Sequence, residues 1–237
     1  MITLRKAKER GHFDFGWLDT HHSFSFGEYH DTAQMGFRSL RVLNEDKVNP
    51  AMGFGNHGHR DMEILSYVLS GELSHKDSQG NVGVIRNGDV QRMTAGTGIM
   101  HSEFNASTTD PVHFLQIWIE PVHKGIAPRY EDRNFPIEKR KNRLCLIASP
   151  DEADGSLSID QDARVYATVL DAGKEVELKV AEGRGVWVQV ARGEIRLGYG
   201  AKEWISLKAG DGAALQGETQ IVIQADKEAE FLVFDLA

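Results

Sequence analysis

The 237-residue sequence has little cysteine, no long apolar run and no excess of basic residues. Its one cysteine, Cys145, rules out a disulfide within the chain, and its neighbours Leu144 and Leu146 predict a thiol buried in a strand. No apolar run approaches the roughly 20 residues of a membrane-spanning helix. The first residues, Met1 to Lys6, become charged at once and lack the apolar region of a secretory signal. We therefore expect a cytoplasmic protein that does not enter a membrane.

The sequence also lacks the positive charge of a nucleic-acid-binding protein. It contains 27 Lys and Arg against 35 Asp and Glu, which gives a formal net charge of -8. Binding to phosphate backbones depends on clustered Lys and Arg, so we expect no direct contact with nucleic acid. One basic run interrupts this pattern, and we interpret it as a solvated face of a linker: Lys139, Arg140, Lys141 and Arg143.

Histidine is absent from the second half of the chain, because none of the ten histidines follows His123. In the first half, His-Gly-His at 57–59 and His-Ser-Glu at 101–103 each place two polar side chains two residues apart. Side chains alternate between the faces of a β-strand, so both members of each pair can point the same way. Two such strands facing each other could direct three imidazoles and one carboxylate to a single point. Such an all N/O ligand set suits iron, nickel, manganese, copper or zinc.

Short apolar runs bounded by glycine, asparagine and aspartate predict a mainly β protein, since long helical periodicity is hard to find. The clearest predicted strands lie at 64–69, 114–119, 144–147, 186–190 and 231–234.

One pattern of glycine-containing turns repeats at a fixed distance along the chain. A Gly-Glu pair at 71–72 ends an apolar strand, and a Gly-Asp pair at 88–89 begins seventeen residues after the first glycine. The same two pairs recur at 193–194 and 210–211, each shifted by 122 residues. Two matches at one offset indicate a duplicated unit, in which a strand ends at a Gly-Glu step into a hairpin and a Gly-Asp turn follows.

The second copy lacks the polar residues of the candidate site. The corresponding positions 179, 181, 223 and 225 hold Lys, Ala, Ile and Ala, which cannot rebuild a metal site. The polar stretch from 129 to 143 separates the two copies. We therefore expect a metal-binding domain at 1–132 and a domain without metal ligands at 133–237, in a chain that acts as a monomer.

Two longer motifs carry the candidate metal residues. They read Gly-Phe-Gly-Asn-His-Gly-His at 53–59, ahead of Asp-Met-Glu at 61–63, and Thr-Ala-Gly-Thr-Gly-Ile-Met-His-Ser-Glu at 94–103. Both resemble the pirin family of the cupin superfamily. Further matches extend the resemblance over nearly the whole chain, at 16–18, 24–27, 40–44 and 234–236. Gly58 departs from the proline that many pirin-like sequences have there, and its flexible backbone could loosen the ligand geometry.

The resemblance implies an all-β bicupin, with two tandem β-barrel domains of the jelly-roll, or double-stranded β-helix, type. It assigns His57, His59, His101 and Glu103 as metal ligands, with Glu63 as the alternative carboxylate. Strand alternation does not decide between the two carboxylates, because Glu63 shares the face of the first two histidines if their strand continues. Iron is the expected ion, with nickel, manganese, copper, zinc or cobalt as alternatives.

The resemblance is closest to bacterial pirin-like proteins with quercetin 2,3-dioxygenase activity. It implies an oxidoreductase that cleaves flavonols at the 2,3 position with O2 and releases carbon monoxide. Glu103 would be both a ligand and the base that takes the 3-hydroxyl proton. The alternative is a non-enzymatic, metal-binding regulator whose oxidation state a protein partner reads. The physiological substrate, a flavonol or another small enol or phenol, is left open.

The remaining histidines and several phenylalanines are not expected to bind metal. We interpret as surface residues, or as residues behind the ligands, the histidines at 12, 21, 22, 30, 75, 113 and 123. Phe24, Phe26, Phe37 and Phe54 fit core packing, with a pocket for a flat substrate as the alternative.

Overall fold

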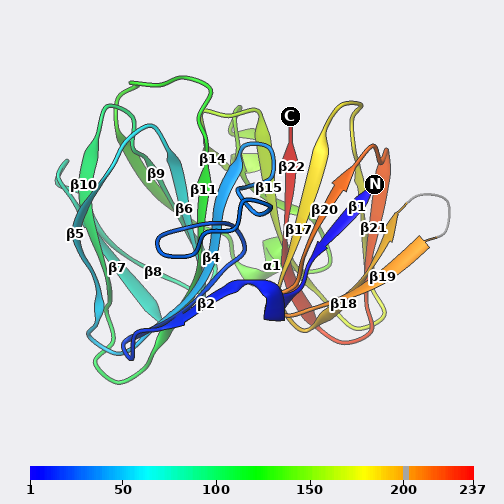
Figure 1. The fold of residues 1–237 in the computed structure, drawn as a ribbon, viewed down its shortest axis with the longest axis horizontal. Helices are drawn as coiled ribbons and strands as arrows, with labels where there is room; N and C mark the ends of the chain where they lie inside the picture. Colours follow the sequence, from blue (N-terminus) through cyan, green and yellow to red (C-terminus); the bar gives the residue numbers. More distant parts are fainter. Residues whose placement is uncertain (200–202) are drawn as a thin grey trace. The chain divides into compact units, whose positions relative to one another are not determined.

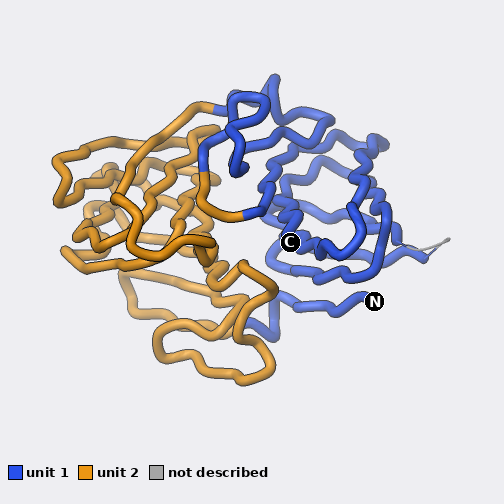
Figure 2. Tube along the Cα trace, turned by 90° about the horizontal axis from the view of Figure 1, so that it is seen from above, with its two compact units in different colours: residues 1–10, 135–158, 162–237 blue, residues 11–134, 159–161 orange. Residues whose placement is uncertain are grey.

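The computed structural model describes residues 1–199 and 203–237, which are mainly β-strands (Figure 1). The all-β class is therefore confirmed. The chain divides into two compact units (Figure 2): unit 2 contains residues 11–134 and 159–161, and unit 1 contains residues 1–10, 135–158 and 162–237. The domain limits of 1–132 and 133–237 stay a prediction.

Unit 2 consists of a seven-stranded and a four-stranded antiparallel sheet. The larger sheet has the order β12-β9-β6-β11-β4-β3-β2, with β2 (Gly11–Asp14), β3 (Leu18–His22), β4 (Leu40–Val48), β6 (Glu63–Ser70), β9 (Asp89–Thr94), β11 (Val112–Ile119) and β12 (Arg129–Asn134). The smaller sheet has the order β5-β10-β7-β8, with β5 (Gly53–His59), β7 (Glu72–Asp77), β8 (Val82–Arg86) and β10 (Ile99–Asn105). Val68 and Phe114 of the larger sheet share one buried cluster with Leu73 and Ile85 of the smaller, so the sheets face each other in a jelly roll.

Unit 1 repeats this plan of a seven-stranded and a four-stranded sheet, and the described strands form a closed barrel in neither unit. Its larger sheet has the order β1-β20-β17-β22-β15-β13-β14, with β1 (Ile2–Arg5), β13 (Cys145–Ser149), β14 (Leu157–Ser158), β15 (Ala163–Leu170), β17 (Gly185–Arg192), β20 (Gly212–Gln216) and β22 (Ala229–Leu236). Its smaller sheet has the order β16-β21-β18-β19, with β16 (Glu175–Lys179), β18 (Glu194–Tyr199), β19 (Glu203–Lys208) and β21 (Gln220–Ala225).

Helical structure in the described residues is confined to short turns. These are the 3-10 turns η1 (Ala7–Glu9) and η2 (Ala153–Gly155) and the helix α1 (Ile137–Arg140). None of the helices in the described part of the chain is long and apolar enough to cross a membrane.

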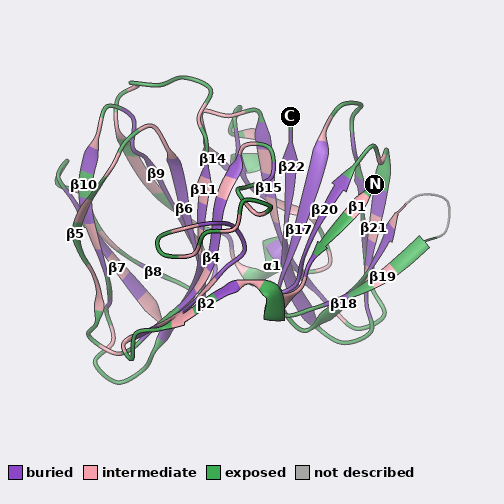
Figure 3. Ribbon diagram, in the orientation of Figure 1, coloured by how far each residue is buried: buried purple, intermediate pink, exposed green. Residues whose placement is uncertain are grey.

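The five strands predicted most clearly are confirmed as parts of β6, β11, β13, β17 and β22. The strands β6, β17 and β22 are buried at nearly every position (Figure 3), which is why they read as continuous apolar runs. Leu144 precedes β13. Cys145 begins that strand half-buried, and burial raises the pKa of its thiol.

Gly71 and Gly193 occupy the same corner in the two units. Gly71 follows β6 and leads into the β7–β8 hairpin, and Gly193 follows β17 and leads into the β18–β19 hairpin. Both have positive φ, +79° and +75°. A Cβ atom would lie 2.6 Å from the Pro111 carbonyl oxygen at the first corner and 2.5 Å from that of Glu228 at the second. Both corners therefore require glycine, at the offset predicted from the sequence.

Replacing Gly193 with alanine is expected to lower the free energy of unfolding by about 2 kcal/mol, because positive φ and a close backbone contact both oppose a Cβ atom. Gly183 is the matched control: its φ is +82°, but nothing lies within 4 Å of an added Cβ. Gly183→Ala should therefore cost about 1 kcal/mol. Urea unfolding followed by circular dichroism measures both losses. Equal losses would show that the approach of Glu228 adds nothing.

Arg140 contradicts the interpretation of the basic run as a solvated linker face. It ends α1 and is only 2% exposed. Its Nη1 pairs with Glu230 Oε1 at 3.0 Å, and its Nε donates to the Phe135 carbonyl oxygen at 2.7 Å. The interpretation is wrong for this residue, because its guanidinium finds both a counter-charge and an acceptor inside unit 1.

Candidate metal centre

The two sequence pairs lie on neighbouring strands of the smaller sheet of unit 2. His57 and His59 belong to β5, and His101 and Glu103 belong to β10. The strands pair antiparallel with His101 opposite His57. The register then shifts, so that Glu103 lies opposite Phe54. The four side chains therefore come together across this one pair of neighbouring strands, β5 and β10.

The three predicted imidazole ligands form one tight group. Donor atoms of His57, His59 and His101 lie within 4.8 Å of one another. Nδ1 of His57 donates to the Gly55 carbonyl oxygen at 2.8 Å, so its Nε2 carries a lone pair. His101 is 0% exposed, and its Nε2 is buried without a hydrogen-bond partner among the described residues. A buried nitrogen of this kind needs a partner that the protein does not supply.

Burial keeps two of these imidazoles, those of His59 and His101, neutral. Burial and then the nearby His57 lower the pKa of His59 to about 4. Burial and then His57 and His59 lower the pKa of His101 to about 2. Metal ligation requires neutral imidazole, so protons do not compete for these nitrogens near pH 7.

Glu103 joins His101 through a second, overlapping group. Donor atoms of His75, His101 and Glu103 also lie within 4.8 Å of one another. The four predicted ligands therefore converge as two groups that share His101, rather than as one group of four.

Three donors orient the buried carboxylate of Glu103. Its Oε1 accepts hydrogen bonds from Ser66 Oγ at 3.2 Å and Gln91 Nε2 at 3.3 Å, and its Oε2 accepts one from Gln116 Nε2 at 2.9 Å. Burial raises the pKa of Glu103, while His75 and the hydrogen bonds oppose that shift. The hydrogen bonds thus fix the carboxylate in place, and a cation bound beside it would stabilise its charged form.

Glu63, the alternative carboxylate, has other partners. It is fully buried, and its Oε2 accepts a hydrogen bond from Thr94 Oγ1 at 2.8 Å. Its Oε1 accepts one from the Asp160 backbone N–H at 3.3 Å. Within the described residues, Glu63 belongs to neither of the two groups around His101.

His75 and Asp77 support the site. The sequence interpretation took His75 as a surface residue or a residue behind the ligands, and it gave Asp77 no role at the site. Nε2 of His75 lies 3.1 Å from Asp77 Oδ2, and its Nδ1 lies 3.4 Å from Nδ1 of His101. Because a carboxylate only accepts, His75 donates through Nε2 and accepts at Nδ1 from His101. These hydrogen bonds, from His101 to His75 and from His75 to Asp77, leave the lone pair of His101 on Nε2, as a metal would require. The His-x-Asp spacing, identical to that of the ligand pairs, was the available signal.

The other histidines lie outside these groups. His12, His30 and His123 are exposed, His21 and His113 are half-buried, and His22 is buried. His12 and His21 form a further group with Asp19, in which the 2.9 Å contact of His12 with Asp19 is an ordinary surface hydrogen bond.

The candidate ligands open onto a cavity of about 280 Å³. His57, His59 and Glu103 line it together with Phe26, Asn44, Asp46, Phe54, Gln116 and Trp118. The Trp118 ring meets His59 at 4.8 Å and Phe26 at 5.2 Å between centroids, both edge to face. Phe26 and Phe54 thus line a pocket, whereas Phe24 and Phe37 lie in the core.

Comparison with known proteins agrees with this architecture. The Pirin family model matches residues 3–119, and a model of the quercetinase C-terminal cupin domain matches residues 146–236. A quercetin 2,3-dioxygenase of Escherichia coli O157:H7 is 48% identical over 236 residues, which cover 100% of this chain and 99% of that protein. The chain belongs to the pirin family. Its two-domain cupin fold, expected from the sequence, is confirmed.

Two solved structures of this family share the fold over the whole chain. The crystal structure of YhhW from Escherichia coli has a TM-score of 0.94 at 45% identity and covers 100% of this chain and 98% of that one. The structure of bacterial pirin YhhW in complex with nickel(II) has a TM-score of 0.92 at 45% identity, with coverage of 100% and 99%.

Proposed function

We propose that this protein is a metal-dependent dioxygenase that cleaves flavonols such as quercetin at the 2,3 position with O2 and releases carbon monoxide. In this proposal His57, His59, His101 and Glu103 hold one divalent transition ion, for which iron is the expectation. The observation that carries the proposal is the buried, unpartnered Nε2 of His101, beside two further imidazoles at the wall of an aromatic cavity. Relatives named quercetin 2,3-dioxygenase and a relative that binds nickel(II) support it.

Each residue around the cavity has a role in this reaction. A divalent ion supplies Lewis acidity, which favours loss of a proton from a phenolic or enolic hydroxyl. Glu103 takes that proton from the flavonol 3-hydroxyl, because its carboxylate lines the cavity and is held by three donors. Trp118 and Phe26 form an apolar wall against which a flat ring packs. The electron-rich flavonolate then reacts with O2 across C2 and C3.

Oxygen uptake with quercetin tests the proposal. Protein loaded with an equimolar amount of iron(II) or nickel(II) is expected to consume O2 and quercetin and to release carbon monoxide, all three in equal amounts. Metal-stripped protein is expected to show no consumption and no release. Elemental analysis of freshly isolated protein identifies the resident ion. Uptake by loaded protein no greater than that of the stripped control would overturn the proposal and favour a metal-binding regulator that acts through a protein partner.

A further inference from the structure

A second cavity adjoins the metal-side cavity in unit 2. It has a volume of about 210 Å³ and shares four lining residues with its neighbour: Phe26, Asn44, Asp46 and Phe54. Because these residues line both, the two cavities adjoin each other. Each alone is smaller than the roughly 300 Å³ at which small-molecule sites begin, whereas together they exceed it.

Two buried polar residues, Asn44 and Asp46, line both cavities, and one Asn44 oxygen has no hydrogen-bond partner among the described residues. Asn44 and Asp46 lie two residues apart on β4, so they share a face, and they are 3% and 4% exposed. Oδ1 of Asn44 is buried without a partner among the described residues. Asp46 accepts a hydrogen bond at its Oδ1, from Thr20 Oγ1, and it lines both cavities beside Asn44. Buried acceptors are normally satisfied, so the Asn44 oxygen calls for a ligand that donates.

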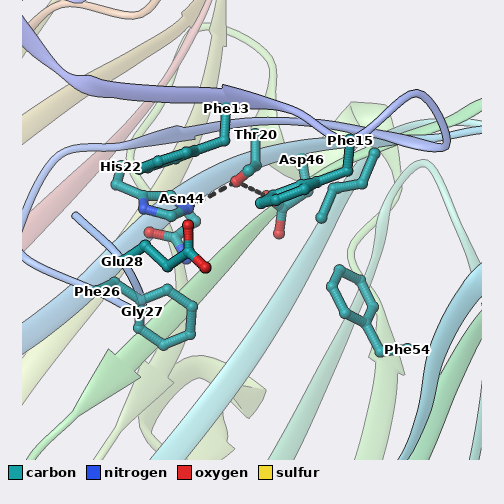
Figure 4. A pocket seen from close by; sticks show the side chains of 11 residues that line it. Phe13, Phe15, Thr20, His22, Phe26, Gly27, Glu28, Asn44, Asp46 and Phe54 are labelled. Atoms are coloured by element: carbon teal, nitrogen blue, oxygen red, sulfur yellow. Dashed lines mark hydrogen bonds between the residues drawn. The ribbon is translucent and has the colours of Figure 1, made fainter.

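Two hydrogen bonds orient the Asp46 carboxylate. Thr20, opposite Asp46 in the β3–β4 register, donates to its Oδ1 at 2.5 Å. Nε2 of His22 lies 2.9 Å from the same hydroxyl. Since that hydroxyl gives its one hydrogen to Asp46, Nε2 of His22 donates to it. One carboxylate oxygen is thereby fixed and the other is left for the cavity, as Figure 4 shows.

Aromatic rings surround these acceptors. Phe13 and Phe15 of the β2 region stack with their centroids 6.0 Å apart and an interplanar angle of 8°. Figure 4 shows them on one side of Asp46 and Asn44, with Phe26 and Phe54 on the other. Phe15 is 52% exposed, so its face is accessible to a ligand. Flat apolar walls with acceptors at their centre favour a planar ring that carries hydroxyl groups.

We propose that this cavity is a second subsite, which binds the hydroxylated pendant ring of a planar polyphenol through hydrogen bonds to Asn44 and Asp46. The proposal rests on the proposed function, because it requires the 3-oxygen of the same molecule to lie at the metal centre. The pendant ring is joined by a single bond to C2, next to that oxygen, so it can turn into the adjoining cavity. The subsite therefore selects polyphenols with hydroxyls on the pendant ring.

Anaerobic binding of two flavonols tests the subsite. Galangin has the quercetin skeleton without hydroxyls on the pendant ring, and quenching of tryptophan fluorescence reports binding beside Trp118 of the adjoining cavity. Metal-loaded protein is expected to bind quercetin about tenfold more tightly than galangin, since a site built for a hydroxyl rejects an analogue without it. Asn44→Leu and Asp46→Asn should each remove most of this preference, so that the ratio of the two affinities falls toward one.

Controls separate this proposal from folding and from the proposed function. Circular dichroism and metal content establish that each variant is folded and loaded, and Asp110→Asn, an exposed loop substitution, should keep the full preference. Equal binding of both flavonols to the unmodified protein, or equal weakening of both in the variants, would overturn the subsite. A clear preference without O2 uptake would support the subsite and overturn only the dioxygenase. O2 uptake without a preference between the two flavonols would support the dioxygenase and overturn only the subsite.

Discussion

Replacing His101 with alanine is expected to weaken metal binding by more than about 100-fold, the upper end of the loss caused by residues that only support a ligand. His101 is common to both donor groups, and its Nε2 is buried without a hydrogen-bond partner among the described residues. Elemental analysis after gel filtration and a competition titration with a chelator measure the loss.

His123→Ala is the control for this experiment, because the His123 side chain is 71% exposed and its Nδ1 pairs with Asp160 Oδ1 at 2.9 Å, outside both donor groups. It should bind metal like the unmodified protein. His57→Ala, at a half-buried position, gives a second test that disturbs the core less. Full metal occupancy in both the His101 and His57 variants would place the metal elsewhere.

Replacing Glu103 with glutamine is expected to lower kcat for quercetin by about 10³-fold per bound metal, within the range for loss of a general base. The amide keeps the shape of the side chain but cannot take a proton, and its NH₂ group would face donors from Ser66, Gln91 or Gln116. Burial already raises the pKa of this carboxyl, so the neutral amide should be tolerated by the fold. Stopped-flow decay of quercetin absorbance measures the rate.

Glu63→Gln is the matched control, because Glu63 is also a fully buried glutamate with its own hydrogen bonds. Its rate should stay within about threefold of the unmodified protein, since its carboxylate contacts Thr94 and Asp160 rather than the cavity. An unchanged rate in Glu103→Gln would remove Glu103 as the base. Loss of activity in Glu63→Gln alone would make Glu63 the functional carboxylate.

The spacing of residues along the sequence predicted which side chains share a face of a strand, but it did not predict which strands pair with each other. The pairs at 57–59 and 101–103 were predicted to share faces, and they do, because strand alternation is a local property. The pairing of β5 with β10, and its register shift before Glu103, depend on contacts distant in sequence. A duplicated unit was predicted because two glycine-containing turns at a fixed offset reflect backbone conformations that few other residues adopt. The tandem cupin fold itself was implied by the resemblance of the two longer motifs to the pirin family.

The residues that support the site could not be predicted from the sequence either, because they too are brought there by contacts between strands distant in sequence. Asn44 and Asp46 precede the first motif, and only the arrangement of β4 and β11 beside the smaller sheet makes them line the cavity. Gln116 reaches Glu103 from β11. Arg140 was misjudged because a charge run looks solvated in sequence, whereas its partner Glu230 lies far along the chain.

The membership of β1 has a consequence for the order in which the protein is completed on the ribosome. Residues 1–10 belong to unit 1, where β1 pairs with β20. The strand β1 must therefore wait for the much later synthesis of β20 before it finds its partner. Residues 11–134, which carry all the candidate ligands, can assemble their sheets while unit 1 is still incomplete. The strands that carry the candidate ligands can thus pair with one another before the ribosome has made β20.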